Sequence, residues 1–535
     1  MNFPAGQFRW LLVLLSILLP ACALTGDRPD ESNSVIIQRR TPVCDPANSI
    51  AANNLFVPAS EQTSASPFKR PATPPAEQTG TPLPITLSTA LSLTQANPLD
   101  IQIADERVRI ASAELDRAKL LWLPNLNLGF DYFRQDGQTQ DILGTVFTTS
   151  RSSVLVGGGP QAVVSTSDAV FAPLAAKRVT KAAQSEAQAT RNDTTLAVAT
   201  AYFNVQQARG EVAGSLESLR RADDLVARTD KLAPDLTPDV EVNRAKTEAA
   251  RRKQAVESAY ERWQVASAEL TRLLRLQPGT LVEPAEDPAL AVKLIDPATT
   301  LDDLTAIGLT YRPELEAHQA LVQAALVRVK QEKRRPFYPV LAARGVGSNT
   351  PGLAGGYFGG GINDQIGNFG PRFSMDLQAV WEFQNLGFGN RAAVRVREGE
   401  SRQALLELQR MQERISAEII QARAQLDRAT KRLKAAEDGV TNAVATAEKN
   451  LQGLGQTKRV GEQLVLVFRP LEAVAAVSAL DQAYSDFYRA VGDHNRAQFR
   501  LFRALGHPSQ ALAQSPESCS ADSARTTEST VGTTP

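Results

Sequence analysis

Residues 97–101 have the sequence NPLDI and residues 312–316 have the sequence RPELE, and each opens a stretch with helical periodicity. Each stretch closes at a second proline, Pro124 in the first case and Pro339 in the second. The two opening prolines are 215 positions apart, and so are the two closing prolines. A spacing that is kept over this distance predicts two tandem repeats.

The repeats divide the chain into folded and unfolded parts. We expect the repeats to occupy residues 85–279 and 298–508, joined by a proline-containing linker at 280–297. Residues 22–84 are rich in Pro, Ser and Thr, and residues 509–535 are polar. Because such compositions bury too little apolar surface to fold, these two segments are predicted to be a linker and a disordered tail.

Residues 1–21 have the features of a lipoprotein signal peptide. Arg9 precedes an apolar run of ten residues, Trp10 to Leu19. This run is shorter than the roughly 20 residues that a membrane-spanning helix needs. Leu19-Pro20-Ala21-Cys22 resembles a bacterial lipobox, which predicts cleavage before Cys22 and acylation of its thiol. The alternative is an ordinary secretory signal in which Cys22 is incidental.

The composition gives no sign of catalysis. The chain has 58 basic and 58 acidic residues, so no nucleic-acid partner is predicted. His318, His494 and His507 lack the spacing of metal ligands, and no nucleophile elbow is present. We therefore predict no catalytic residues, no metal site and no cofactor. Cys44 and Cys519 either pair in an oxidising compartment or remain free thiols.

Long helices with narrow apolar seams are predicted in both repeats. Between Leu408 and Leu451, apolar or small residues recur at alternating spacings of three and four, which is typical of a coiled coil. The equivalent helix of the first repeat is expected from about Leu174 to Leu232. A helix of about 60 residues is about 90 Å long, which no compact domain needs. Arg252 interrupts the seam of the returning helix.

Segments with period-two alternation lie between the helices. Residues 126–133 and 373–383 alternate apolar with polar side chains, and the second segment carries Asp376 and Glu382 on its polar face. This pattern is typical of a membrane-barrel strand, with lipid on one side and water on the other. A half-buried strand of a soluble sheet alternates in the same way, and the sequence leaves both interpretations open.

Weaker strand patterns at residues 154–171 and 340–346 supply a partner for each of these segments. We expect loops at residues 135–151 and at the glycine-rich residues 352–361, which gives two hairpins and four strands per chain. Four strands cannot close a barrel, and lipid does not tolerate open sheet edges. We therefore predict a mainly α-helical fold with a membrane β-barrel that several chains complete together.

Several motifs resemble, in their order and duplicated spacing, those of the TolC family of outer-membrane efflux and secretion channels. The resemblance covers residues 85–508. The motifs are Asn97-Pro98, Leu123-Pro124, Val170-Phe171-Ala172-Pro173-Leu174, Ala201-Tyr202-Phe203-Asn204, Tyr311-Arg312-Pro313-Glu314-Leu315, Trp381-Glu382-Phe383 and Gly387-Phe388-Gly389-Asn390-Arg391. No motif is specific by itself, so the resemblance rests on their order.

The resemblance implies a homotrimer whose strands, four from each chain, form one 12-stranded barrel in the outer membrane. Its long helices would form a coiled-coil α-helical barrel, a tunnel in the periplasm. The far tips of the helices would meet a periplasmic adaptor protein (a membrane fusion protein) of an inner-membrane pump. A lipidated cysteine is common in one branch of the family, which agrees with Cys22 as an anchor to outer-membrane lipid.

By the same resemblance, the narrow end of the tunnel lies at the helical tips. Acidic residues that ring this aperture in some family members map onto Glu472, and Glu241 stands at the corresponding place in the first repeat. A second acidic position of the family falls on Ala475, and a short insertion lies near Gln463–Phe468. One interpretation is a single ring of Glu472 that favours cations. Alternatively, Glu472 is an exposed acid at a helix N-terminus, where the helix dipole favours it.

Other residues at the two tips are candidate contacts for the adaptor. They are Asp235, Asp239, Arg459, Gly461, Glu462 and Arg469. Their charged side chains fit an exposed solvated surface equally well.

Three functions fit the sequence. The first is a passive exit duct of a tripartite efflux system for small molecules or metal ions. The second keeps the fold but exports polypeptides by type I secretion. The third is a lipid-anchored coiled-coil scaffold without a channel, whose strand segments form soluble hairpins.

Overall fold

The computed structural model describes residues 82–96, 98–123, 125–233, 236–346, 356–362, 367–372, 374–460 and 463–506. These residues all belong to the compact unit that spans Leu55–Pro535. The predictions made for Cys22, Cys44, Asp235, Gly461, Glu462 and Cys519 lie outside the described residues. Among the helices of the described residues, none combines the length and the apolar character needed to cross a membrane.

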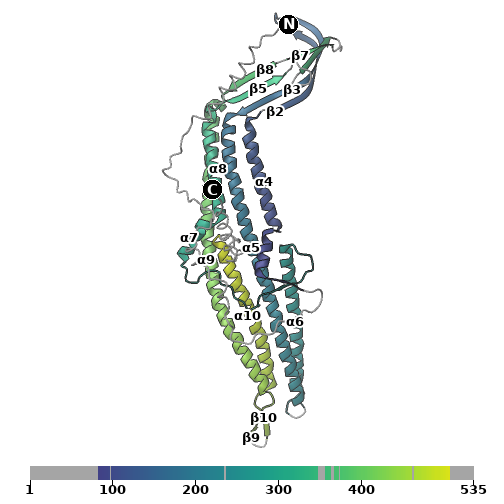
Figure 1. The fold of residues 1–535 in the computed structure, drawn as a ribbon, viewed down its shortest axis with the longest axis vertical. Coiled ribbons are helices and arrows are strands. Elements are labelled where there is room, and N and C mark those ends of the chain that lie inside the picture. Colours follow the sequence, from purple (N-terminus) through teal and green to yellow (C-terminus); the bar gives the residue numbers. More distant parts are fainter. Residues whose placement is uncertain are drawn as a thin grey trace, which may run out of the picture. The chain divides into compact units, whose positions relative to one another are not determined.

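The order of elements in the first half of the chain recurs in the second half (Figure 1). The first half contains β1 (Leu83–Ile85), α3 (Leu87–Ala96), α4 (Leu99–Lys119), η3 (Leu120–Trp122), β2 (Asn125–Gln140), β3 (Val146–Ser165), α5 (Thr166–Leu232), α6 (Asp239–Leu274) and β4 (Val282–Pro284). The second half contains α7 (Leu301–Tyr311), α8 (Pro313–Arg334), η4 (Arg335–Phe337), β5 (Val340–Val346), β6 (Gly356–Ile362), β7 (Gly367–Arg372), β8 (Ser374–Val380), η5 (Gln384–Gly387), α9 (Phe388–Gly453), β9 (Thr457–Val460), β10 (Gln463–Leu466) and α10 (Pro470–Ala504).

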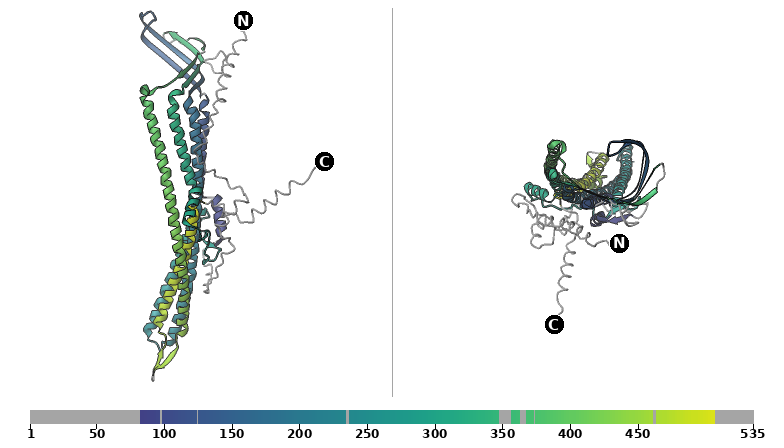
Figure 2. Two further views of the ribbon diagram at one scale, coloured as in Figure 1. Left: turned by 90° about the vertical axis from the view of Figure 1, so that its left-hand side faces the viewer. Right: turned by 90° about the horizontal axis from the view of Figure 1, so that it is seen from above.

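Equivalent helices in the two halves have nearly equal lengths. Helices α4 and α8 contain 21 and 22 residues, α5 and α9 contain 67 and 66, and α6 and α10 contain 36 and 35. Near the sheet, α4, α5, α8 and α9 pack side by side, and at the other end the neighbours are α6, α5, α10 and α9. The view from above shows that the helices follow a curve (Figure 2). The two long helices therefore connect the sheet to the tips without a break.

The start of α5 differs from the prediction. The helix begins at Thr166, where the side chain of Ser165 accepts a hydrogen bond from the backbone N–H of Asp168 (3.4 Å). Such a cap is a strong start signal. The sequence analysis instead placed the start at about Leu174, after a strand predicted at residues 154–171, of which residues 166–171 are helical in the structure. In the structure Pro173 lies inside the helix.

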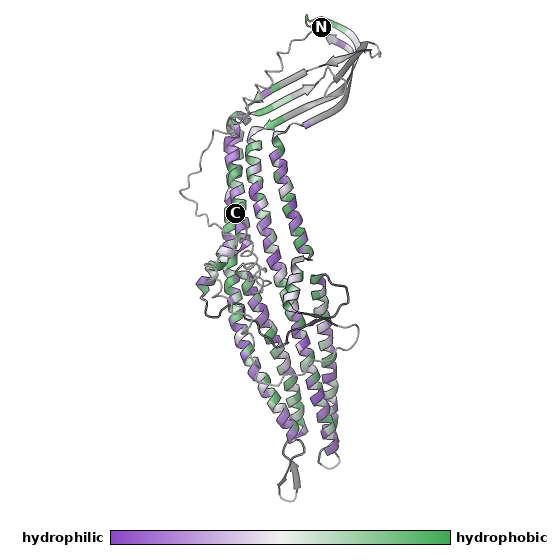
Figure 3. Cartoon of the chain, in the orientation of Figure 1, coloured by the Kyte–Doolittle hydropathy of each residue, from purple (hydrophilic) through white to green (hydrophobic). Residues whose placement is uncertain are grey.

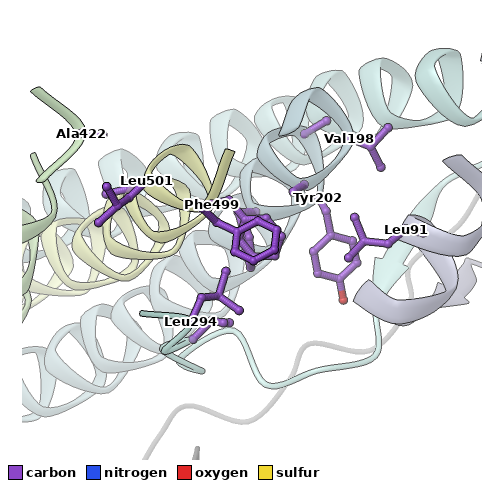
Figure 4. Packing of buried hydrophobic residues seen from close by; sticks show 14 of the residues in the cluster. Leu91, Val198, Tyr202, Leu294, Ala422, Phe499 and Leu501 are labelled. Atoms are coloured by element: carbon purple, nitrogen blue, oxygen red, sulfur yellow. The ribbon is translucent and has the colours of Figure 1, made fainter. Parts of the chain in front are cut away.

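The helices are held together by the predicted narrow seams of apolar and small residues. Along α9 the buried seam residues are Ile415, Ile419, Ala422, Leu426, Ala429, Val440, Ala447 and Leu451, as the periodicity predicts. Hydrophilic and hydrophobic residues alternate along every long helix (Figure 3). The largest cluster gathers where α3, α5, α9, α10 and the inter-repeat segment meet, and it includes Leu91, Tyr202, Leu294 and Phe499 (Figure 4).

A buried charge cluster joins the start of α8 to α9 and α10. The Arg312 side chain is 2 % exposed and donates to Oε1 of Glu314 (2.8 Å) and Oε2 of Glu418 (2.6 Å). Arg503 donates to the same two carboxylates at 3.1 and 3.0 Å. Burial raises the pKa of both carboxyl groups, but the hydrogen bonds and charge of Arg312 outweigh it and hold each pKa below its usual value. The cluster therefore stays ionised.

The sheet is built around β3. One edge of β3 pairs with β2, from Val146 to Gln161. The other edge pairs with β5 through Gln161–Ser165 and with β6 through Arg151–Val156. Because β5 and β6 pair with the same edge of β3, β6 continues the line of β5. Strand β8 pairs with β5 and β7 pairs with β6, so β7 continues the line of β8. The six segments thus follow four strand lines, which agree with the two predicted hairpins.

The predicted loops of this sheet are wrong over most of their length. Strand β2 continues to Gln140 and β3 begins at Val146, so only residues 141–145 connect them, and β6 occupies part of the second predicted loop. Residues 134–140 of β2 and 148–153 of β3 are polar or glycine and lack an apolar face, but their backbones pair regularly. Arg151 also donates to Oε1 of Gln135 across the pair (2.8 Å). Backbone pairing therefore extends the hairpin where no side-chain pattern marks it.

Candidate functional site at the helical tips

The first tip is the short connection between α5 and α6. Helix α6 begins after Pro238, and its first turn carries Asp239 and Glu241, where negative charge is favourable. Asp239 is exposed. Glu241 is half-buried and accepts a hydrogen bond from Nη1 of Arg244 (2.6 Å). The candidate gate residue of this tip is therefore already paired within the chain.

The second tip is longer because β9 and β10 form an antiparallel hairpin between α9 and α10. This hairpin is the structure of the insertion noted in the sequence, and it extends past the ends of the helices (Figure 1). At its base, the backbone N–H of Val467 donates to the carbonyl of Gln456 (2.8 Å). The ring of Phe468 lies so close to Gly453 that a Cβ atom there would stand 2.4 Å from Cδ2. The hairpin is thus anchored to the end of α9.

The remaining candidate residues lie around the start of α10. Glu472 is exposed in the first turn, and no cation of the described residues pairs with its carboxylate. Arg469 precedes the helix and is exposed, and Ala475 is exposed one turn further on. Arg459 lies in β9, opposite Leu464. Both the gate and the helix-terminus interpretations of Glu472 need an exposed carboxylate, which this position provides.

A shared core holds the two tips together. It contains Ala222 and Leu225 of α5, Ala245 of α6, Leu451 and Leu454 at the end of α9, and Ala473 and Val477 of α10. Arg228 of α5 also donates to the carbonyl of Leu451 (2.8 Å). All four helices therefore converge at the tips as one packed body.

An open groove of about 360 Å³ lies between the starts of α6 and α10. It is lined by Val240, Asn243, Arg244, Thr247, Glu248, Arg251, Leu471 and Val474. Val240 and Leu471 directly precede the two candidate glutamates, Glu241 and Glu472, so the groove places the equivalent positions of both repeats next to each other. The sequence did not predict this groove, because it depends on which helices become neighbours.

Further from the tips than the groove, a buried ion cluster links α6 to α10. Arg252 binds Oε1 of Glu248 (2.9 Å) and the carboxylate of Asp481. Burial raises the pKa of Asp481, and the charge of Arg252 opposes that effect. Arg252 was noticed in the sequence only as an interruption of the seam. That interruption is the signal of this cluster, since a charge in a seam needs a partner.

The described residues contain no group of three or more His, Cys, Asp or Glu side chains that could hold a metal ion. His494 is buried between helices, where its Nδ1 lies 3.2 Å from Oγ1 of Thr430, and burial lowers its pKa. Its surroundings are those of a neutral, structural histidine.

Several solved structures have a similar architecture. The structure is similar to the outer-membrane channel OprN, with 16 % sequence identity and a TM-score of 0.62 over 85 % of this chain and 97 % of that one. It is also similar to the outer membrane protein VceC of Vibrio cholerae (16 % identity, TM-score 0.57, 79 % of this chain and 96 % of that one). A third match is the open state of the MtrE outer membrane channel of Neisseria gonorrhoeae (14 % identity, TM-score 0.60, 84 % and 99 %).

These likenesses show that the chain has the fold of outer-membrane channels. They confirm, at the level of the fold, the resemblance to the TolC family that the sequence motifs predicted. No family model matches the chain, and no curated protein matches its sequence. The similar structures share 14–16 % of their sequence with this chain, so they show its fold and assign no role to any single residue.

Proposed function

We propose that the chain is a passive exit duct in the outer membrane, active as a homotrimer in a tripartite efflux system that exports small molecules or metal ions. Its helices form a periplasmic tunnel, and its tips dock with a periplasmic adaptor that is joined to an inner-membrane pump. The pump supplies the energy, and this chain supplies a hydrated path without catalysis or cofactor. A lipid on Cys22 adds a second anchor in the same membrane.

One observation carries the proposal: helices too long for a compact domain run directly into a sheet that is incomplete in one chain. A helix of 67 residues is about 100 Å long at 1.5 Å per residue. Within the described residues, β2 pairs only with β3, and the line of β7 and β8 pairs only with that of β6 and β5. Open sheet edges are not stable in lipid. The two open edges of this sheet therefore support a barrel that further copies of the chain close.

Light scattering and negative-stain imaging of the detergent-extracted protein test this proposal. We expect a trimeric particle that needs detergent and is a narrow cylinder longer than about 100 Å. A monomer or dimer that is stable without detergent would contradict the proposal and leave the scaffold interpretation standing. Ion conductance of the same preparation in planar bilayers then tests for an open path, which a scaffold lacks.

A further inference from the structure

Large apolar side chains are exposed where the helices α4, α5, α8 and α9 meet the sheet (Figure 1). Two of them, Trp381 and Phe383, are 54 % and 61 % exposed and continue in sequence the apolar alternation of β8. We call the whole set the collar; its other members are Leu120, Leu121, Trp122, Leu123, Val170, Leu174, Phe337, Leu386 and Phe388. Trp is enriched at membrane–water interfaces, so an apolar collar at the end of this sheet indicates contact with lipid.

Exposed cations stand next to the collar on α5 and α9. On α5, Lys177 follows Leu174 by three residues. On α9, Arg391 and Arg395 follow Phe388 by three and seven residues, and the guanidinium group of Arg391 lies 6.0 Å from the centre of the Phe388 ring. Residues at these spacings share one face of a helix. The cations therefore lie on the same side of the helices as the collar, one or two turns further from the sheet.

Helix α8 has the same arrangement in its last turns. Lys330 and Arg334 are exposed and one turn apart, and Phe337 follows them in η4. The guanidinium group of Arg334 lies 5.9 Å from the centre of the Phe171 ring, which belongs to the neighbouring α5. Three helices from both halves of the chain thus place positive charge beside exposed apolar residues at the same junction.

These cations are available to an external anion. Within the described residues, no carboxylate forms an ion pair with any of the five, which are Lys177, Lys330, Arg334, Arg391 and Arg395. The neighbouring Lys181 and Lys333 are by contrast each paired with a glutamate. Residues 166–181, 328–337 and 388–402 together carry twelve basic and four acidic side chains, whereas the whole chain has 58 of each. Positive charge is therefore concentrated beside the collar.

We propose that the collar and the five cations form a binding surface for anionic phospholipids of the membrane leaflet next to the helices, with the collar among the acyl chains and the cations on the phosphate groups. The proposal rests on the proposed function, in which the sheet is part of an outer-membrane barrel. Arginine and lysine suit this place, because their methylene groups pack on apolar surface while their charged ends reach phosphate oxygens. Basic clusters beside a membrane segment attract anionic lipids.

Neither a second copy of this chain nor water in the tunnel accounts for the exposed faces of α5 and α8. These two helices lie between α4 and α9, so a further copy in the same wall can add only beside the outer two. The faces of α5 and α8 nevertheless carry Leu174 and Phe337, which are 50 % and 76 % exposed. Contact with water alone makes such apolar side chains unfavourable, whereas lipid covers them. The occupant that fits both the apolar and the basic residues is an anionic lipid.

Quenching of tryptophan fluorescence by brominated lipids tests this assignment on the full chain. Trp122 and Trp381 belong to the collar, whereas Trp263 is 2 % exposed in the helical core and supplies an unquenched background. The protein is reconstituted in phosphatidylcholine vesicles that contain brominated phosphatidylglycerol or the same fraction of brominated phosphatidylcholine. We expect phosphatidylglycerol to be enriched about fivefold or more around the two exposed tryptophans. The enrichment should decrease as salt screens the charges.

Two pairs of substitutions separate local from general charge effects. Lys330→Ala with Arg334→Ala removes two cations beside the collar and should lower the enrichment about threefold or more. Lys431→Ala with Lys434→Ala is the matched control, because it removes two exposed cations from a part of α9 far from the collar and should change nothing. Trp381→Phe identifies the reporter, since it should remove part of the quenching and leave the part that comes from Trp122.

Three results would overturn the assignment. They are equal quenching by the two brominated lipids, an enrichment that the α8 variant keeps, and exposed tryptophans that neither lipid quenches. Trimer formation and conductance are measured on the same vesicles. If both persist while phosphatidylglycerol is not enriched, the lipid assignment falls and the proposed duct stands. A protein that does not enter the vesicles removes the two together.

Discussion

The ring of Tyr488 on α10 lies against Gly210 on α5, where a Cβ atom would stand 2.3 Å from the ring atom Cδ1. One turn away on each helix, Tyr484 faces Gly214 in the same manner, with 2.6 Å to its Cβ. Both tyrosines are almost fully buried. Two glycines on one helix thus receive two tyrosines from an antiparallel neighbour, and this contact brings α5 of the first half close to α10 of the second half.

The Gly210→Ala variant should be less stable than the native protein. Alanine gains about 1 kcal/mol in helix propensity, but its methyl group overlaps the Tyr488 ring, and overpacking costs about 1–3 kcal/mol. We expect a lower thermal unfolding midpoint by circular dichroism. Gly439→Ala is the matched control, because a Cβ at this position of α9 meets nothing within 4 Å of the chain. Equal midpoints for the two variants would show that the tyrosine contact does not restrict position 210.

The Arg312 cluster should make stability fall in acid. The pKa values of Glu314 and Glu418 lie below the usual 4.5 in the folded chain. A carboxylate with a lowered pKa contributes stability that is present above its unfolded pKa and is lost as the pH falls through the folded value. We therefore expect the thermal midpoint, followed by circular dichroism, to drop as the pH falls below about 4.5.

Removal of Arg312 should weaken this pH dependence of the thermal midpoint. At neutral pH, Arg312→Ala leaves two half-buried carboxylates without their main partner, a loss of about 3–5 kcal/mol. Protonation relieves that penalty, so the difference from the native protein should narrow below pH 4.5. Arg109→Ala, which removes an exposed pair with Glu106, should stay parallel to the native curve. If the thermal midpoint of Arg312→Ala differs from that of the native protein by the same amount at every pH, this cluster is not the source of the loss of stability in acid.

Glu472→Gln distinguishes the two interpretations of this residue. If three copies of Glu472 ring the narrow end, their loss should lower the preference for cations. The reversal potential of the channel under a salt gradient in planar bilayers then moves toward zero. If Glu472 only complements the helix dipole, the variant loses about 0.3–1 kcal/mol of stability and the reversal potential does not move. Asp239→Asn, at the equivalent helix start of the first tip, is the control and should leave selectivity unchanged.

Much of the helical architecture could be predicted, because side-chain periodicity reports directly on burial along a helix. Ile415, Ile419 and Leu426 are buried where the alternating spacing placed them. The polar ends of β2 and β3 could not be predicted, since backbone pairing holds them and their side chains follow no pattern. The start of α5 was missed because residues 154–171 were predicted as a strand, whereas the helix begins after its cap at Ser165.

The tips were located from the sequence, but their arrangement was not. Glu241 and Glu472 stand at corresponding places in the two repeats, but the structure distinguishes them, because Arg244 binds Glu241 while Glu472 is exposed. The groove between α6 and α10 joins Val240 to Leu471 across more than 200 positions of sequence. Contacts of this kind depend on the packing of four helices, which no local pattern reveals.

The lipid on Cys22 and the shared barrel are predicted to be independent anchors, and Cys22→Ala separates them. The variant lacks the thiol that carries the acyl chain, so labelling of cells with a radioactive fatty acid should no longer mark the protein. A closed barrel is held in the membrane by all of its strands, whether or not a lipid is attached. We therefore expect the variant to remain in the membrane fraction. Light scattering of the detergent extract should show the same trimer as for the native protein. Loss of the trimer in this variant, or its release into the soluble fraction, would mean that the lipid and not the strands holds the protein in the membrane.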